Sequence, residues 1–361
     1  MSEWVLSFIK SLALLTIQIV SISYSIEVFS VENTIIENQA IEVPSPNIFM
    51  NEEIISPHTT QLPTALISLG NEPISYALIV EKLQHKLSVY KSSSKGDYEL
   101  IKAYRAITGK KQGDKKFTGD KRTPEGIYFI TGKINGNKLP PKYGPGAFIL
   151  DYPNIYDQRL SKTGYGIWIH GVEDDSRADK PFDTDGCIAL KNKDWLELEQ
   201  YIFPFDTPVI ITKEMKVAIS HQDIHEQKEK IMKLIEDWRL SWKDSELEKY
   251  NSFYSNSFNS SGKDKRQWLD MKKNISSIRN RKISIEISEP KILAFENQVL
   301  VSFFQKYQSQ GKEDFGRKFL YFQLEDSNYK IVSEKWFNEP EKNDHINALV
   351  RQNNNELNTK Q

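Results

Sequence analysis

The sequence lacks a second cysteine. Its 361 residues contain only Cys187, so no disulfide can form within the chain. In an exported protein an unpaired thiol is open to oxidation and to pairing with other chains. A lone cysteine is nevertheless more often a buried structural residue than a catalytic one. The residue types around Cys187 must therefore decide its role.

The chain also lacks an excess of charge of either sign. Forty-eight basic residues stand against 49 acidic residues, which gives a formal net charge of -1. No basic stripe interleaved with aromatic side chains is present, and nucleic-acid binding is therefore disfavoured. Apolar residues make up 39% of the chain, enough to bury real cores, and the length suits two domains.

Long apolar runs are missing beyond the N-terminus. The run Ser11–Ile22 follows Lys10 and is shorter than the roughly 20 residues that a membrane helix needs. This pattern favours a signal peptide over residues 1–25 and export to the cell envelope. If Val5–Phe8 are counted in, an uncleaved membrane anchor is the alternative, and a buried amphipathic helix is another. Membrane contact is expected only through this segment.

Residues 26–72 are rich in proline and sustain neither a helical nor a strand period, which predicts an arm or linker. Short alternating segments separated by Gly, Pro and Asn turns then predict a mainly β domain over residues 73–214. Its predicted strands cover 75–80, 86–90, 98–104, 126–130, 147–150, 166–169 and 208–212, mostly antiparallel, with one helix over 192–202.

The composition changes after Lys213. Residues 218–337 begin with an apolar stripe at helical spacing over 221–250 and a second helical pattern over 265–278. Alternating segments over 282–288, 298–304, 317–323 and 329–333 then predict strands, so this domain is expected to be an α+β cone. The polar tail 338–361 is expected to fray.

His170 and Cys187 form the best candidate catalytic pair. His170 ends an apolar segment and Cys187 follows it by 17 positions, at the start of another. A thiol needs a nearby base to react near neutral pH, and an imidazole can take its proton and return it to a leaving amine. Gly171 has no side chain, so its carbonyl can approach the other imidazole nitrogen and fix the tautomer.

The backbone around Cys187 also suits acyl transfer. Gly186 allows a sharp turn directly before the thiol. The consecutive N–H groups of Asp185, Gly186 and Cys187 are then candidates for an oxyanion hole. Spacing alone is weak evidence, because any chain offers some distance between a histidine and a cysteine.

These motifs resemble those of the YkuD-type L,D-transpeptidase catalytic domain. His170-Gly171, the loop, and Thr184-x-Gly186-Cys187 match its signature, and Gly119-Asp-Lys-Arg-Thr-Pro-Glu-Gly126 resembles its Gly-Asp-x-x-Thr-Pro-x-Gly stretch. Thr108-Gly109 and Tyr143-Gly144-Pro145 agree with the same pattern. The resemblance covers about residues 75–213 and implies a β-sandwich-like fold. It also implies peptidoglycan stem peptides as substrates and a periplasmic location.

The resemblance also assigns roles, with two departures. It implies that Tyr143 and Thr184 bind substrate. Many members carry a histidine where this chain has Asp185, and an arginine two residues after the cysteine where this chain has Ala189. That arginine anchors a substrate carboxylate, and Arg122 and Arg177 are the candidate replacements.

The second domain resembles a nuclear-transport-factor-2-like (SnoaL-like) domain. This module follows a YkuD-type domain in the cell-shape-determining L,D-carboxypeptidases of helical bacteria. The resemblance implies that the N-terminal arm takes part in homodimerisation, and that the second domain binds or docks.

No metal or organic cofactor is expected. His221, His225 and Glu226 have helical spacing, but a solvated helix start explains them better than a metal site does. Gly109–Gly119 lacks the phosphate-loop pattern. The predicted function is therefore that of an L,D-transpeptidase or L,D-carboxypeptidase acting through a Cys187 thioester. A non-catalytic wall-binding scaffold with a relict site is the alternative.

Overall fold

The computed structural model describes residues 63–71, 75–93, 98–218, 220–276, 282–309 and 311–338. The predicted signal peptide, nearly all of the predicted arm and nearly all of the predicted tail lie outside these ranges. Within them, no helix is both long enough and apolar enough to cross a membrane.

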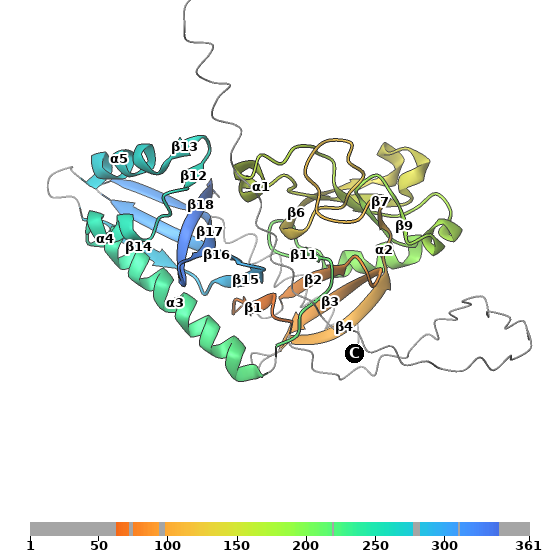
Figure 1. The fold of residues 1–361 in the computed structure, drawn as a ribbon, viewed down its shortest axis with the longest axis horizontal. Helices are drawn as coiled ribbons and strands as arrows, with labels where there is room; N and C mark the ends of the chain where they lie inside the picture. Colours follow the sequence, from red (N-terminus) through yellow and green to blue (C-terminus); the bar gives the residue numbers. More distant parts are fainter. Residues whose placement is uncertain are drawn as a thin grey trace, which may run out of the picture. The chain divides into compact units, whose positions relative to one another are not determined.

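The first domain is built on an eight-stranded sheet with the order β10-β8-β7-β6-β11-β2-β3-β4 (Figure 1). Its alternating apolar residues pack into a core that includes Tyr128, Phe148 and Trp195. The strands are β2 Tyr76–Glu81, β3 Lys86–Ser92, β4 Tyr98–Arg105, β6 Gly126–Asn135, β7 Gly146–Leu150, β8 Trp168–His170, β10 Ile188–Ala189 and β11 Pro208–Thr212. A separate pair joins β5 Thr108–Gly109 to β9 Phe182–Thr184. The predicted mainly β domain is confirmed.

Pairing in this domain is mostly antiparallel, as predicted, and the exceptions are parallel pairs. β11 pairs with β2, β10 with β8, and β5 with β9, all in parallel. Each parallel pair joins strands that are separated by a long connection, and such connections return the chain in the same direction. The parallel pair β8–β10 includes His170 at the end of β8 and begins directly after Cys187 on the side of β10.

Short helices and 3₁₀ turns fill the connections of this domain. The helix expected over 192–202 is α2 Asn192–Leu198, continued by the 3₁₀ turn η4 Glu199–Tyr201. Helix α1 Ile155–Arg159 was not predicted; Asn154 and Asp157 form a capping box at its start. The other turns are η1 Gly136–Lys138, η2 Pro141–Tyr143 and η3 Asp175–Asp179.

The second domain places helices against a curved antiparallel sheet. Ile231, Ile235, Trp238 and Trp242 form the buried stripe of α3, at spacings of three and four residues. The predicted helix over 221–250 is two helices, because α3 ends at Lys243 and Ser245 takes a left-handed φ of 60°. The elements are α3 His221–Lys243, α4 Leu247–Ser252, β12 Asn259–Ser260, β13 Lys263–Asp264, α5 Lys265–Ser276, β14 Ser284–Ile287, β15 Lys291–Phe295, β16 Gln298–Ser309, β17 Lys312–Glu325 and β18 Asn328–Asn338.

One strand of this second sheet comes from before the first domain. β1 Leu66–Leu69 pairs antiparallel with β15, and both Leu66 and Leu69 are buried. The sheet order is β1-β15-β16-β17-β18, with β14 also paired to β16. The sequence pattern predicts a linker here, and the structure places an edge strand in it.

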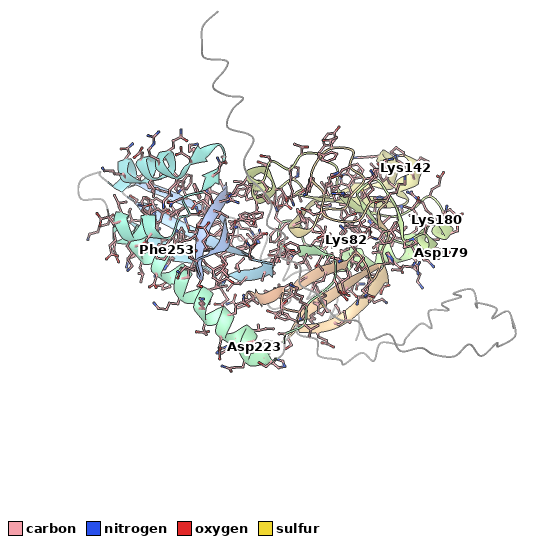
Figure 2. The ribbon with its side chains drawn as sticks, in the orientation of Figure 1. Lys82, Lys142, Asp179, Lys180, Asp223 and Phe253 are labelled. Carbon is pink, nitrogen blue, oxygen red and sulfur yellow. The ribbon has the colours of Figure 1, made fainter. Side chains whose placement is uncertain are left out.

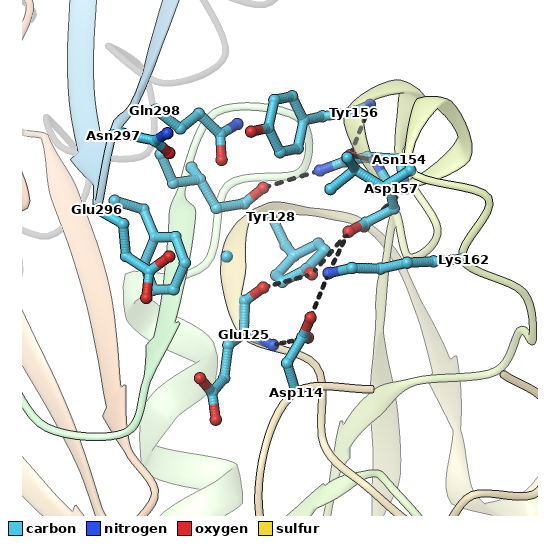
Figure 3. A pocket seen from close by; sticks show the side chains of 14 residues that line it. Asp114, Glu125, Tyr128, Asn154, Tyr156, Asp157, Lys162, Glu296, Asn297 and Gln298 are labelled. Atoms are coloured by element: carbon cyan, nitrogen blue, oxygen red, sulfur yellow. Dashed lines mark hydrogen bonds and ion pairs between the residues drawn. The ribbon is translucent and has the colours of Figure 1, made fainter. Parts of the chain in front are cut away.

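The two domains meet through polar and aromatic contacts. Asp206, just before β11, accepts bonds from Lys291 at 2.6 Å and Arg317 at 3.1 Å. The rings of Phe129 and Phe319 pack edge to face, with their centroids 5.2 Å apart. Figure 3 shows a crevice beside these contacts, in which the β15–β16 turn faces side chains of α1 and the start of β6.

The core of the second domain holds a buried ion pair. Glu334 on β18 is 2% exposed, contacts the Lys318 ammonium and accepts a bond from the Tyr254 hydroxyl at 2.8 Å. Burial alone would raise the pKa of Glu334. The charges of Lys318 and Lys272 outweigh burial and lower that pKa, so the carboxylate stays ionised.

Candidate functional site

His170 is held at the end of β8 by its own neighbour. The imidazole Nδ1 lies 2.5 Å from the Gly171 carbonyl oxygen, and the side chain is almost fully buried. Because a carbonyl can only accept, this contact requires the proton on Nδ1 in the neutral ring. Nε2 is then left with its lone pair free to accept a proton.

Cys187 lies beside β8, directly before the neighbouring strand β10. The parallel register pairs Ile188 with Ile169 and Ala189 with His170, and its continuation places Cys187 next to Trp168. Residues two apart on a strand share a face, so Cys187 and His170 lie on the same face of the sheet. The thiol is partly buried and points its Sγ to the Gly166 carbonyl oxygen at 3.3 Å.

The turn before Cys187 depends on Gly186. Its φ of +132° is disfavoured for residues with a side chain, and a Cβ there would lie 2.8 Å from the Arg122 carbonyl oxygen. Thr184 accepts a bond from the Gly186 N–H at 3.2 Å and donates its hydroxyl to the Cys187 carbonyl at 2.7 Å. The Gly186 N–H is thus already engaged. Asp185 and Cys187 supply the other N–H groups of the predicted oxyanion hole.

The resting pair is electrically neutral at neutral pH. Burial lowers the pKa of His170 to about 4, against the opposing effect of its bond to Gly171. Burial also raises the pKa of the Cys187 thiol, although a hydrogen bond with the Trp168 backbone and the charge of Lys142 both act to lower it. The arrangement therefore suits proton transfer during attack more than a preformed thiolate–imidazolium pair.

This burial predicts a pH-dependent loss of stability. The folded-state pKa of His170 lies below the unfolded value of about 6.5, so the contribution is present above pH 6.5 and is lost as pH falls toward 4. Between pH 7 and pH 4.5 we expect the free energy of unfolding to fall by about 2 kcal/mol more in the wild type than in His170→Gln. Urea titrations at the two pH values measure this difference. Equal losses in both proteins would contradict the buried neutral imidazole.

Gly171 sits where no side chain fits. A Cβ at this position would lie 2.4 Å from the Asn192 Oδ1 atom and 2.4 Å from the Pro145 Cδ atom. Asn192 also accepts the Val172 N–H at 2.8 Å, and so holds the segment directly after the histidine. The close packing fixes the carbonyl that orients His170.

Gly171→Ala is therefore expected to lower the free energy of unfolding by about 2 kcal/mol, a typical cost of overpacking. Chemical denaturation measures the loss. Gly132→Ala is the matched control, because a Cβ at Gly132 would meet nothing within 4 Å. If both variants had the same stability, the tight fit around Gly171 would be refuted.

The Gly119–Gly126 motif shapes the wall of the site. Burial of Asp120 is outweighed by the Lys115 ammonium at 2.6 Å and by backbone N–H donors, which lower the pKa of its carboxyl to about 2. Thr123 accepts the Gly109 N–H at 2.9 Å, and its hydroxyl lies 3.4 Å from the Cys187 carbonyl oxygen. The motif is thereby joined directly to the cysteine loop.

The predicted substrate-binding residues differ in their surroundings. The Tyr143 ring lies 4.9 Å from the His170 ring and 5.1 Å from that of Trp168, measured between centroids. Thr184 is buried, and its hydrogen bonds with Gly186 and Cys187 stabilise the turn before the cysteine. Arg177 is bound to the Asp183 carboxylate at 2.8 Å, and Arg122 donates to the Asp114 carbonyl at 3.5 Å.

Two residues near the site were not predicted from the sequence. In the sequence Asn192 is only the first residue of a predicted helix, whereas in the structure its Oδ1 atom packs closely against Gly171. Lys142 stands on the exposed 3₁₀ turn η2, and its ammonium lies 5.0 Å from the centroid of the Tyr143 ring. Both come close to His170 only because the fold brings separate loops together.

Comparison with known proteins agrees with the fold of both domains. The L,D-transpeptidase catalytic domain (YkuD) profile matches residues 75–211, and the Cds6 C-terminal NTF2-like domain profile matches residues 230–335. A solved structure of Bd1075 from Bdellovibrio bacteriovorus is 32% identical, with a TM-score of 0.68, and the match covers 78% of this chain and 100% of that one. The chain belongs to the YkuD family.

A second solved relative of this YkuD protein is the helical cell shape determining protein Pgp2 from Campylobacter jejuni. It is 31% identical, with a TM-score of 0.62, and the match covers 74% of this chain and 94% of that one. The comparison with curated proteins gave no match. The family relationship supports the general class of a peptidoglycan-modifying L,D-transpeptidase or L,D-carboxypeptidase.

Proposed function

We propose that this YkuD protein is an L,D-carboxypeptidase that removes the terminal D-Ala from the tetrapeptide stems of peptidoglycan. The bond cleaved joins meso-diaminopimelate to that D-Ala. The observation that carries the proposal is the 2.5 Å contact from His170 Nδ1 to the Gly171 carbonyl, on the strand beside Cys187. It prepares a neutral base on the same face of the sheet as the lone thiol.

The proposed reaction has two steps. Cys187 Sγ attacks the carbonyl carbon of meso-diaminopimelate, and His170 Nε2 takes the thiol proton. The C–N bond then breaks, the imidazolium gives its proton to the departing amine of D-Ala, and a thioester remains. Water, deprotonated by His170, attacks the thioester and releases the tripeptide and the free thiol.

The charge that develops on the carbonyl oxygen needs donors. The N–H groups of Asp185 and Cys187 are the proposed oxyanion donors, together with Gly186 if its bond to Thr184 yields to the oxyanion. Tyr143 lies against the base and is a proposed contact for the substrate. Arg122 and Arg177 remain predicted substrate ligands.

Transfer to an amine in place of water would give a crosslink between stems by the same thioester. The absence of an arginine two residues after Cys187 and the NTF2-like domain both support hydrolysis. We further propose that the protein acts in the periplasm, where stem peptides lie. Dimerisation through residues 26–72 stays a prediction that lies almost wholly outside the described residues.

Purified protein incubated with disaccharide-tetrapeptide, followed by mass spectrometry, tests the proposal. Disaccharide-tripeptide with free D-Ala supports the carboxypeptidase. A crosslinked dimer as the product would mean that the enzyme is a transpeptidase and not a carboxypeptidase. An unchanged substrate, with Cys187 still open to alkylation, would favour the non-catalytic wall-binding scaffold.

A further inference from the structure

Three cations act on the catalytic pair, and two of them are already neutralised. The charge of Lys115 lowers the pKa of Cys187, but its ammonium is held by Asp120 at 2.6 Å in a buried pair. The charge of Arg177 lowers the pKa of His170, but its guanidinium is held by Asp183 at 2.8 Å. Neither has a free charge to offer an anionic substrate without first breaking an ion pair.

Lys142 is the third cation, and its charge acts on both His170 and Cys187. Within the described part of the chain, Lys142 has no carboxylate partner. Its ammonium rests over the face of Tyr143, whose ring in turn meets the edge of the His170 ring. Figure 2 shows Lys142 on the catalytic domain, at the upper right of the view.

Position 189, two residues after Cys187, does not supply this charge. Ala189 is fully buried on β10 and is hydrogen-bonded to Ile107 on its other side, so no long cationic side chain extends from there into the site. A donor stem that ends in a free carboxylate needs a cation beyond the scissile bond, on the side of the leaving group. Lys142 is exposed, and its charge acts on His170, the base that protonates that leaving group in the proposed reaction.

We propose that Lys142 is the specificity residue that binds the terminal carboxylate of the donor stem, so that the chain selects peptides ending in a free D-amino acid. This inference rests on the proposed function. The ammonium moves from the Tyr143 face to the carboxylate when the stem enters. Arg122 and Arg177 then need not leave their present partners to bind that carboxylate.

The test compares two donors, a disaccharide-tetrapeptide with a free terminal carboxylate and the same compound as its terminal amide. Lys142→Met should lower kcat/KM for the free acid by about 10- to 100-fold, mainly through KM, and change the amide by less than about 3-fold. Lys142→Arg should restore most of the preference. Lys138→Met, at another exposed lysine on the preceding 3₁₀ turn, should change neither. Equal losses on acid and amide, or no loss, would overturn the assignment.

A second readout needs no turnover. Cys187 is alkylated with anionic iodoacetate and with neutral iodoacetamide at the same pH, and the ratio of the two rates is measured. Lys142→Met should lower this ratio about 3- to 10-fold, because it removes the free cation that attracts the carboxylate. If the wild type cleaves neither donor, the proposed function fails, but the ratio of the two alkylation rates still tests whether Lys142 attracts an anion to Cys187. An unchanged ratio refutes the placement.

Discussion

Cys187→Ala is expected to lower the rate of D-Ala release from disaccharide-tetrapeptide by at least about 10⁴-fold. The reason is that the proposed thioester forms on the Cys187 sulfur, and without it His170 can activate only water. Product formation is followed by mass spectrometry over hours, so that a slow residual rate is measured as well.

The fold should survive this change. Cys187 is only partly buried, and the polar contacts of its Sγ are with backbone groups, the Gly166 carbonyl and the Trp168 backbone. Loss of so small a side chain should cost less than about 1 kcal/mol. The matched control is therefore the melting temperature of Cys187→Ala, which should stay within a few degrees of the wild type. Retained turnover in a folded variant would remove the thioester mechanism.

Glu334→Leu is expected to lower the free energy of unfolding by about 3–5 kcal/mol, as when one partner of a buried ion pair is removed. Lys318 is 6% exposed, and the loss of Glu334 would leave its ammonium without that carboxylate. The Tyr254 hydroxyl would lose its bond to Glu334 as well and keep only its contact with the Tyr250 hydroxyl as an acceptor. Guanidinium denaturation followed by tryptophan fluorescence suits the measurement, since Trp238 and Trp336 both lie about 6 Å from the Lys318 ammonium.

The double variant Glu334→Leu with Lys318→Met separates loss of the pair from loss of shape. It should regain most of the lost stability, because replacing both members of a buried pair by apolar groups is often nearly neutral. A double variant as unstable as Glu334→Leu alone would show that packing, and not the stranded ammonium, sets the cost.

Local patterns were sufficient to predict much of this molecule. Strand β2 is a short apolar run that is buried along nearly its whole length, and α3 carries a buried stripe at spacings of three and four residues, so sequence pattern and burial agree. The His170-Gly171 and Gly186-Cys187 motifs were also legible, because glycine is needed where a Cβ would collide with a neighbour.

What the sequence did not reveal depends on contacts between distant segments. The parallel pairing of β8 with β10 is invisible in strands of three and two residues. The sequence also does not show that Lys142 is the cation left without a carboxylate, because Arg177 pairs with Asp183 and Lys115 with Asp120 only in the folded chain. Which cation is left free is a property of the assembled fold.

Strand β1 is synthesised long before β15, the strand with which it pairs. Leu66 and Leu69 are made first, the whole YkuD domain follows, and only then does β15 appear with Leu293 opposite Leu66. A nascent chain that has completed its catalytic domain therefore still carries an unsatisfied apolar strand at its front. Each domain has its own core, but the two domains cannot finish folding strictly one after the other. Strand β1 gains its partner in the sheet only when β15, in the last third of the chain, has been synthesised.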